Sequence, residues 1–382
     1  MTNQVAVESA MLRGIEAVPV TVECVIEKGL PSFTIVGMVG AGVLEGRERV
    51  RCAIKSAGFT WPNGHIIVNL APSTMKKCSS HFDLAIAIAI LAASSQIDPE
   101  PFKKTVVFGE LMLDGTVVPN QRGFAAYLNL VRHAGVQVVC ASRQFVSSGF
   151  ASDVDIACIE TLDDLRAGFV QPRFVEPETQ DLGWNDDIDP NGLDHYIREA
   201  IDKRSTLLVM TNRHDEVAKR VKFWIERAVG LNDFELDEVE IIASVASAPL
   251  PPSTRLGMCR PFRAPHHSIT LAGLIGGGNP IYPGEVTLAH NGVLFLEHAE
   301  ELVPKQLDAL RHTRAKRRVR ITRADGTVEM PADCAIIATA NPCPCGNFGD
   351  PDKECTCSAT QILHFQNRVC GCGNGLFSKV VR

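Results

Sequence analysis

Apolar positions in the first 170 residues follow two periods, one typical of strands and one typical of helices. Short runs rich in β-branched residues predict strands, and apolar residues spaced three or four apart predict helices. Strands are expected at 20–26, 65–70 and 105–108, and helices at 45–57, 82–94 and 123–134. The pattern therefore predicts an α/β or α+β domain over residues 1–170.

A change of composition separates this region from the rest of the chain. Residues 171–195 contain three prolines and a run of acidic side chains, and such a segment does not build an apolar core. Beyond it, continuous apolar runs have the character of strands buried in a parallel sheet. These runs lie at 206–211, 292–296 and 334–340. The sequence thus predicts a linker at 171–195 and a second α/β unit at 196–382.

Composition places the chain among ordinary globular proteins. Its 382 residues are 45% hydrophobic and 21% charged, which is enough for two or three domains with cores of their own. The net charge of −6 argues against a wholly basic nucleic-acid coat but leaves room for a local basic patch. The longest apolar run, 84–93, is about half of a membrane span, and no signal peptide is recognisable. A cytoplasmic protein without membrane contact is expected.

Four motifs follow one another in the second unit. They are Arg-Pro-Phe-Arg-Ala-Pro-His-His at 260–267, Gly-Gly-Gly at 276–278, Leu-Ala-His-Asn-Gly-Val-Leu-Phe-Leu at 288–296 and Ala-Asn-Pro-Cys-Pro-Cys-Gly at 340–346. In these motifs the chain resembles the magnesium-chelatase-like AAA+ family, specifically its ComM/YifB branch. The resemblance implies a P-loop-type AAA+ α/β core, ATP hydrolysis coupled to work on DNA, and partners that are paralogous or identical subunits, as in a ring. The core is expected to lack the helical lid of the family.

The first domain also resembles its counterpart in ComM-like proteins, in segments 29–37, 68–72, 82–87 and 108–111. That domain shares its fold, the ribosomal S5 domain 2-like fold, with the Lon protease domain and the C-terminal domain of RadA. The resemblance therefore implies a Lon-C/RadA-C-like N-terminal domain.

The likeness to Lon raises a protease hypothesis, which requires a serine paired with a lysine. Asp83 stands about where the nucleophilic serine would be, and 120–122 lies near the expected lysine. A second serine and lysine set is close in sequence, at Ser79, Ser80, Lys76 and Lys77. A serine-rich turn with exposed lysines explains this set more simply, so protease activity is not expected.

The loop that should hold the nucleotide departs from the family pattern. A phosphate-binding loop needs a glycine-rich turn, a lysine for the terminal phosphates and a hydroxyl for Mg²⁺. No glycine occurs between Gly192 and Gly230, and the strand at 206–211 continues into a polar stretch without such a loop. This degenerate loop comprises Thr211, Asn212, Arg213, His214, Asp215 and Glu216. An alternative hypothesis gives the lysine's role to Arg213 or Lys219.

The other ATP-handling positions are altered as well. The next strand ends in Glu297-His298, where the family has an aspartate for Mg²⁺ and a glutamate that activates water. Asn341 matches the sensor asparagine of the family, and Lys379 or Arg382 is a candidate arginine finger. The loop, the base and the lid are changed together. We therefore expect neither ATP hydrolysis nor a resident Mg·ATP, and we name no confident catalytic residue.

Cysteines gather near the C-terminus, in the segment 343–372. Cys343, Cys345, Cys355 and Cys357 form two Cys-X-Cys pairs, and four thiolates satisfy a tetrahedral structural zinc site. The pair Cys370 and Cys372 is an alternative source of ligands, and free thiols on a loop are the competing interpretation.

A basic segment, 311–323, carries seven lysines and arginines and leads into a predicted hairpin with a turn at 324–326. In the family this hairpin and the glycine loop at 276–278 face the central pore. The resemblance therefore suggests that Arg318, Arg320 and Arg323 approach DNA phosphates. The alternative is a solvated surface or a subunit interface.

These observations leave three hypotheses for function. The first is a non-hydrolysing AAA+ module, a pseudo-ATPase, that binds related subunits and contacts DNA. The second is an active DNA-dependent ATPase of branch-migration or helicase type with an atypical nucleotide site. The third is a magnesium-chelatase-type subunit. The N-terminal domain favours a ComM-like protein over the third, since true chelatase motor subunits lack that domain.

Overall fold

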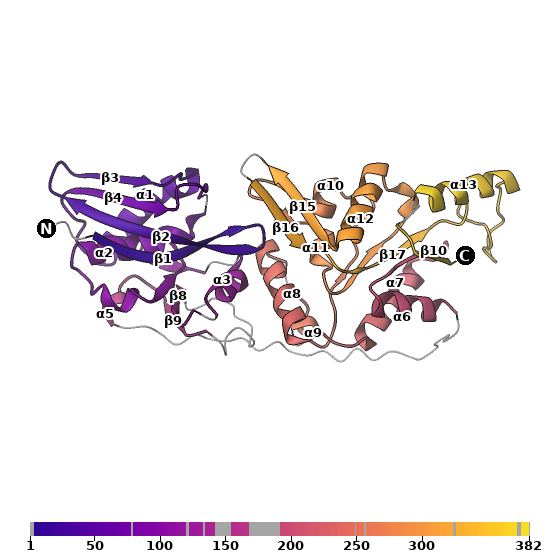
Figure 1. The fold of residues 1–382 in the computed structure, drawn as a ribbon, viewed down its shortest axis with the longest axis horizontal. Coiled ribbons are helices and arrows are strands. Elements are labelled where there is room, and N and C mark those ends of the chain that lie inside the picture. The colour runs from indigo at the N-terminus through magenta and orange to yellow at the C-terminus, as the bar shows by residue number, and fades with distance from the viewer. Residues whose placement is uncertain are drawn as a thin grey trace. The chain divides into compact units, whose positions relative to one another are not determined.

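The structure, a computed structural model, describes residues 4–77, 79–119, 122–132, 134–141, 154–167, 192–248, 250–255, 257–323, 326–372 and 376–381. The chain divides into two compact units, Met1–Glu176 and Pro177–Arg382 (Figure 1). The linker expected at 171–195 lies outside the described residues up to residue 191.

The first unit is built on a seven-stranded mixed sheet in the order β3-β4-β2-β1-β5-β8-β9. Its strands are β1 (Gln4–Arg13), β2 (Glu16–Glu27), β3 (Ser32–Val36), β4 (His65–Ala71), β5 (Thr105–Val107), β8 (Gln137–Ala141) and β9 (Ile156–Ile159), with a small ladder of β6 (Glu110–Leu111) and β7 (Val117–Val118). Its helices are α1 (Ala41–Ser56), α2 (Asp83–Ala93), α3 (Phe124–Val131) and α5 (Asp164–Ala167), with the short 3-10 turns η1 (Ser80–Phe82) and η2 (Glu100–Phe102).

Helix α2 forms the centre of this unit's core. Every residue of α2 is buried, so the helix has no polar face and can only lie inside the domain. It packs against β1, β2 and α1. β1 and β2 pair antiparallel along their whole lengths, from Gln4 opposite Val25 to Arg13 opposite Glu16. The sheet and α2 together bury one continuous apolar cluster.

The second unit contains a five-stranded sheet in which every neighbouring pair is parallel, in the order β11-β14-β17-β10-β18. Its strands are β10 (Thr206–Met210), β11 (Phe262–Arg263), β14 (Val293–Leu296), β17 (Ala335–Ala340) and β18 (Lys379–Val381). The helices are α6 (Leu193–Asp202), α7 (His214–Arg227), α8 (Asp233–Ala246), α9 (Pro252–Arg255), α10 (Leu271–Ile275), α11 (Glu285–Leu288), α12 (Pro304–Lys316) and α13 (Ala359–Cys372), with the 3-10 turn η3 (Ala299–Glu301). Two small ladders complete it, β12 (Gly276–Gly277) with β13 (Tyr282–Pro283), and β15 (Arg318–Arg323) with β16 (Gly326–Pro331).

The three central strands of this sheet, β10, β14 and β17, are buried throughout. Their continuous apolar sequences match the parallel sheet predicted for them. The parallel arrangement places the loops after β10, β14 and β17 at one edge of the sheet. In open α/β sheets this carboxyl edge is where ligands bind. Among the described residues, no helix combines the length and the apolar character that crossing a membrane requires.

Candidate functional site

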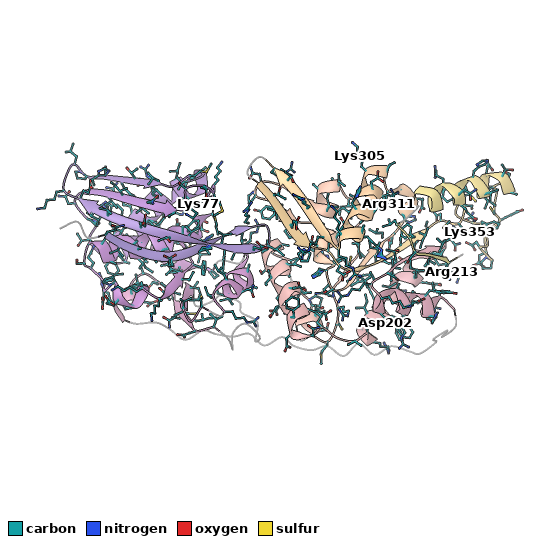
Figure 2. All side chains as sticks on the ribbon, in the orientation of Figure 1. Lys77, Asp202, Arg213, Lys305, Arg311 and Lys353 are labelled. Carbon is teal, nitrogen blue, oxygen red and sulfur yellow. The ribbon has the colours of Figure 1, made fainter. Side chains whose placement is uncertain are left out.

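The carboxyl edge of the parallel sheet gathers the residues singled out for nucleotide chemistry. The loop after β10 leads into α7 at His214, β14 ends next to Glu297 and His298, and β17 ends next to Asn341. Arg213 stands at the start of α7 (Figure 2). The structure therefore brings together the residues that were assigned to the degenerate nucleotide loop and to the following strands.

Histidine side chains fill this edge. His214 Nδ1 lies 2.7 Å from Thr339 Oγ1, and its Nε2 lies 3.2 Å from Asn341 Oδ1. The ring of His214 is 4.0 Å from the ring of His298, centre to centre. His298 has a left-handed backbone with φ of 53°. The imidazole of His214 thus forms hydrogen bonds with the polar side chains at the end of β17.

Carboxylates surround these histidines. His298 Nδ1 lies 3.2 Å from Glu300 Oε1, and that same oxygen accepts a hydrogen bond from the backbone N–H of Asn341 at 3.3 Å. On the other side, His267 Nε2 lies 3.1 Å from Glu301 Oε2. Negative charge therefore lines the space next to the sensor position.

The first turn of α7 carries its own anions. Asp215 and Glu216 stand there, where a bound phosphate would otherwise meet the positive end of the helix dipole. Arg213, the proposed substitute for the missing lysine, pairs with Glu216 at 3.3 Å. Asn212 donates a hydrogen bond of 2.6 Å to Asp350. The loop that follows β10 is thus engaged with acidic groups of this chain.

The arginines of the Arg-Pro-Phe-Arg motif hold the surrounding structure. Arg260 Nε donates to the carbonyl of Val229 at 2.9 Å, and its Nη1 donates to the carbonyl of Asn291 at 2.8 Å. Arg263 makes a two-pronged ion pair with Glu285, at 2.6 and 2.8 Å. These contacts explain the motif's residue types by packing and hydrogen bonding. The adjacent His266 likewise contacts Ser268, at 2.8 Å.

The four predicted cysteine ligands form one cluster. Their sulfur atoms all lie within 4.8 Å of one another, with separations of 3.4 Å for Cys343–Cys345, 3.6 Å for Cys345–Cys355 and 3.8 Å for Cys343–Cys355. A tetrahedron with Zn–S bonds of about 2.3 Å has edges of about 3.8 Å. The spacing of the sulfurs therefore suits a four-coordinate metal such as zinc. The side chains of Cys370 and Cys372 lie outside the described residues.

Backbone groups prepare one of these thiols for metal. The N–H groups of Asn347 and Thr356 donate to Cys345 and lower the pKa of its thiol to about 5. A pKa this low favours the thiolate of Cys345, which is the form that ligates metal, whereas the neighbouring thiols of Cys355 and Cys357 have raised pKa values. Cys343 is fully buried, and the other three sulfur-bearing side chains are half-buried. The cluster follows directly on Asn341 in sequence.

The predicted basic hairpin is confirmed as β15 and β16, paired from Arg318 opposite Pro331 to Arg323 opposite Gly326. Residues 324 and 325 of its turn lie outside the described residues. Val319 and Ile321 are buried, while Arg318 and Arg320 alternate with them on the exposed face. Glu329 lies 3.7 Å from both of these arginines. The hairpin packs against the glycine ladder, where Gly276 leaves space for Ile321.

In the part of the first unit that the structure describes, neither Ser79 nor Ser80 bonds to Lys76 or Lys77. Lys77 was expected to be exposed, and this expectation is wrong, because the side chain is fully buried. Its ammonium donates to the carbonyls of Gly37 and Pro72. Ser79 bonds to His81, and Ser80 bonds to Glu110. Residues 120 and 121, near the expected lysine of a Lon-type site, lie outside the described residues.

Asp83, at the position of the Lon nucleophile, is buried at the start of α2. Its Oδ2 accepts a hydrogen bond of 2.8 Å from Arg49 Nε on α1. Burial raises the pKa of the Asp83 carboxyl to about 6, against the opposing effect of the Arg49 guanidinium. This ion pair ties α1 to α2 and offers no nucleophile.

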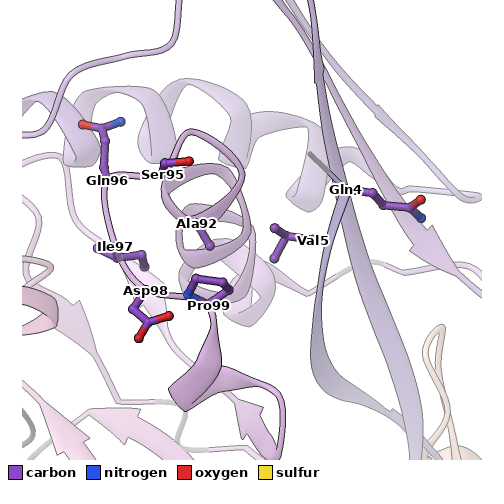
Figure 3. Close-up of a pocket in the computed structure, with 8 residues that line it drawn as sticks. All are labelled: Gln4, Val5, Ala92, Ser95, Gln96, Ile97, Asp98 and Pro99. Atoms are coloured by element: carbon purple, nitrogen blue, oxygen red, sulfur yellow. The ribbon is translucent and has the colours of Figure 1, made fainter. Parts of the chain in front are cut away.

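A hollow of about 710 Å³ lies elsewhere in the first unit, near the start of β1 and the end of α2 (Figure 3). It is lined by Gln4, Val5, Ala92, Ser95, Gln96, Ile97, Asp98 and Pro99. Asp98 is the one charged side chain in this lining, so the lining offers no pair of charged groups for acid–base chemistry.

Comparison with known proteins assigns the chain to a family. The family described as magnesium chelatase, subunit ChlI, matches residues 218–374, and a second family described as subunit ChlI of Mg-chelatase matches residues 22–144. The fold is that of a mixed α/β protein with a parallel sheet, as the resemblance implied. The chain belongs to the magnesium-chelatase-like family of ComM and YifB proteins.

Its relatives share sequence over nearly the whole chain. An uncharacterized protein of Mycobacterium tuberculosis is 30% identical over 378 residues, which cover 95% of this chain and 73% of that protein. The competence protein ComM of Haemophilus influenzae is 31% identical, over 94% of this chain and 72% of its own length. The uncharacterized protein YifB of Escherichia coli is also 31% identical, over 94% and 71%.

Proposed function

We propose that this chain is a non-hydrolysing member of its family, which binds related subunits and contacts DNA without turning over ATP. The observation that carries the proposal is the engagement of His214. Its two ring nitrogens contact Thr339 and Asn341, and its ring packs on His298, at the edge where the family's resemblance places the phosphates.

Charge supports the same proposal. A nucleoside triphosphate entering here would meet Asp215, Glu216, Glu300 and Asp350, and the arginine at the start of α7, Arg213, is already paired with Glu216. At the end of β14, His298 stands where the family has the carboxylate that activates water. The imidazole of His298 lacks the negative charge of that carboxylate, and its Nδ1 is engaged by Glu300.

Subunit binding draws support from an exposed apolar patch. Val229, Phe234 and Met258 are 81%, 71% and 59% exposed, and their two chain segments are joined by a hydrogen bond from the Leu231 N–H to the Gly257 carbonyl. Large apolar side chains gathered on a surface are typical of protein–protein contacts. We propose that this patch meets a second copy or a related subunit.

DNA contact draws support from the hairpin. Arg318 and Arg320 are 68% and 62% exposed, and their partner Glu329 is held only at 3.7 Å. Arg323, at the turn end of the same strand, is exposed as well. Such weakly paired guanidinium groups are free to exchange Glu329 for backbone phosphates. The competing interpretation, a subunit contact through the same arginines, predicts no binding of DNA.

For the cysteine cluster we propose a structural zinc ion held by Cys343, Cys345, Cys355 and Cys357. The sulfur spacing and the lowered pKa of Cys345 support it. Zinc would there supply folding energy to the loop after β17, rather than a catalytic centre.

The proposal is tested by measuring ATP hydrolysis and nucleotide binding, with and without DNA. We expect no turnover and no binding of ATP at micromolar concentrations. Turnover above about 0.1 per second, in the range of working enzymes, that falls in Glu297→Gln would instead establish an active ATPase with an atypical site.

Association of subunits is measured by sedimentation, and Phe234→Asp in the apolar patch should weaken it. The exposed Leu363→Asp serves as the matched control.

A further inference from the structure

The segment that precedes α2 holds a serine in contact with a buried histidine. Ser79 is exposed, and its Oγ lies 2.5 Å from Nδ1 of His81. The other ring nitrogen of His81, Nε2, lies 2.7 Å from the carbonyl oxygen of Ala10 on β1. The imidazole thus bridges a surface hydroxyl and a backbone carbonyl inside the domain.

These contacts define the tautomer of His81. A carbonyl oxygen can only accept, so Nε2 carries the hydrogen and donates it to Ala10. Burial lowers the pKa of His81 to about 4, so the ring is neutral at physiological pH and can hold an abstracted proton only transiently, because burial disfavours its charged form. In the neutral ring Nδ1 then has a lone pair, and it accepts the hydrogen of the Ser79 hydroxyl.

The imidazole is also held rigidly. Its ring packs on those of Phe82, Tyr127 and Phe108, with centre distances of 4.3, 5.5 and 6.2 Å. The carbonyl of His81 accepts a hydrogen bond from the Gly109 N–H at 3.1 Å. A serine bonded to a base that is itself oriented by a third group is the arrangement of an activated nucleophile.

We propose that Ser79 is a nucleophile, with His81 as its general base and the Ala10 carbonyl as the group that orients the base, and that it reacts with activated acyl groups such as carboxylic esters. Ser79 Oγ attacks the acyl carbon with its lone pair, while its proton moves to His81 Nδ1. The bond to the leaving oxygen then breaks with its electron pair, and that oxygen takes the proton from Nδ1. Water hydrolyses the acyl-serine by the same route in reverse.

The neighbouring serine provides a matched control within the chain. Ser80 Oγ donates a hydrogen bond of 2.7 Å to Glu110 Oε2, so its hydroxyl has no contact with an imidazole. Ser79 and Ser80 are thus adjacent residues of the same type that differ in their partner. An ordinary turn held by local hydrogen bonds leaves both hydroxyls equally inert.

The test is labelling of the full chain with a fluorophosphonate, which reacts with an activated serine as its phosphorus–fluorine bond breaks. Mass spectrometry should find the adduct on Ser79 in the native protein and none in the urea-unfolded protein. Labelling should persist in Ser80→Ala and vanish in Ser79→Ala. A folded His81→Asn variant should react at least about tenfold more slowly than the parent protein, because the base is gone.

Two outcomes overturn the proposal. One is a native protein in which Ser79 gains no adduct, or gains it no faster than Ser80. The other is a His81→Asn variant that melts cooperatively and still labels at the rate of the parent. If His81→Asn does not fold, the comparison of Ser79→Ala with Ser80→Ala still decides, because both positions lie at the surface end of the turn.

Discussion

The rings of His214 and His298 lie 4.0 Å apart at the carboxyl edge of the parallel sheet, one from the start of α7 and the other from the loop after β14. Through Thr339 and Asn341, His214 also reaches the end of β17. One side chain therefore joins the ends of three parallel strands, at the edge for which we propose the loss of nucleotide binding.

If His214 has this structural role, its removal should destabilise the fold. We expect His214→Ala to lower the free energy of unfolding by about 1–2 kcal/mol, since two hydrogen bonds and a ring contact are lost. Urea denaturation followed by circular dichroism measures the change. His266→Ala is the control, because exposed His266 contacts its sequence neighbours, Ser268 by a hydrogen bond and His267 by a ring contact of 3.9 Å, and should change stability by less than about 0.5 kcal/mol. Equal effects of the two substitutions would contradict the assignment.

The cysteine cluster predicts about one zinc per chain in protein purified without chelator, as measured by plasma mass spectrometry. Cys343→Ser combined with Cys345→Ser should lose the metal and unfold at a lower temperature, because metal binding contributes to folding. Cys52→Ser combined with Cys259→Ser, outside the cluster, should keep it. A metal-free parent protein would reject the site.

The hairpin predicts binding of DNA that depends on salt and not on sequence. Three arginines on phosphates give a slope of log affinity against log salt of about −2 to −3. Replacing Arg318, Arg320 and Arg323 by alanine should remove most of that slope and leave the melting temperature unchanged. Replacing Arg198 on α6, Lys203 just after it and Lys219 on α7 by alanine removes the same charge from exposed positions, and should leave the slope intact. Binding absent at low salt would exclude this role.

Two buried groups in the first unit should give opposite dependences of stability on pH. The pKa of His81 falls from 6.5 to about 4 on burial, so between these values the unfolded chain binds the extra proton and stability rises with pH. The pKa of Asp83 rises from 3.8 to about 6, so between those values the folded chain binds the extra proton and stability falls with pH. Each contributes about 3 kcal/mol over its window, and in the parent protein the two slopes largely cancel.

Single substitutions should expose each slope. In Asp83→Asn the remaining effect of His81 should make the protein more stable at pH 6.5 than at pH 4.5. In His81→Asn the remaining effect of Asp83 should make it less stable at pH 6 than at pH 4.5. Urea denaturation across this range measures both variants, and slopes of the same sign would show that one of the two groups is not buried as described.

Much of the fold was predictable because its signals are local. The apolar run that becomes α2 and the stretch from Pro304 into the hairpin carry their patterns in consecutive residues, and the structure confirms helices and strands there. The cysteine pairs also predicted their own cluster, since the four residues are close in sequence.

The contacts that complete the site were not predictable in this way. Whether His214 meets Asn341, or Asn212 meets Asp350, depends on how the sheet places loops from distant parts of the sequence. Ser79 and His81 are only two residues apart, yet their contact matters because β1 supplies the carbonyl of Ala10. The one clue in sequence was the serine-rich turn itself, and it pointed to the neighbouring lysines, of which Lys77 is buried and bonds to backbone carbonyls.

The hydrogen bond between Asn212 and Asp350 has a practical consequence. Asp350 lies between the two cysteine pairs, so the position of its carboxylate depends on the loop that the sulfurs gather. An amide at residue 212 should therefore report on that loop by its chemical shift in NMR. Titrating the protein with a chelator would make this resonance a local gauge of metal occupancy, read at the start of α7 and not at the sulfurs.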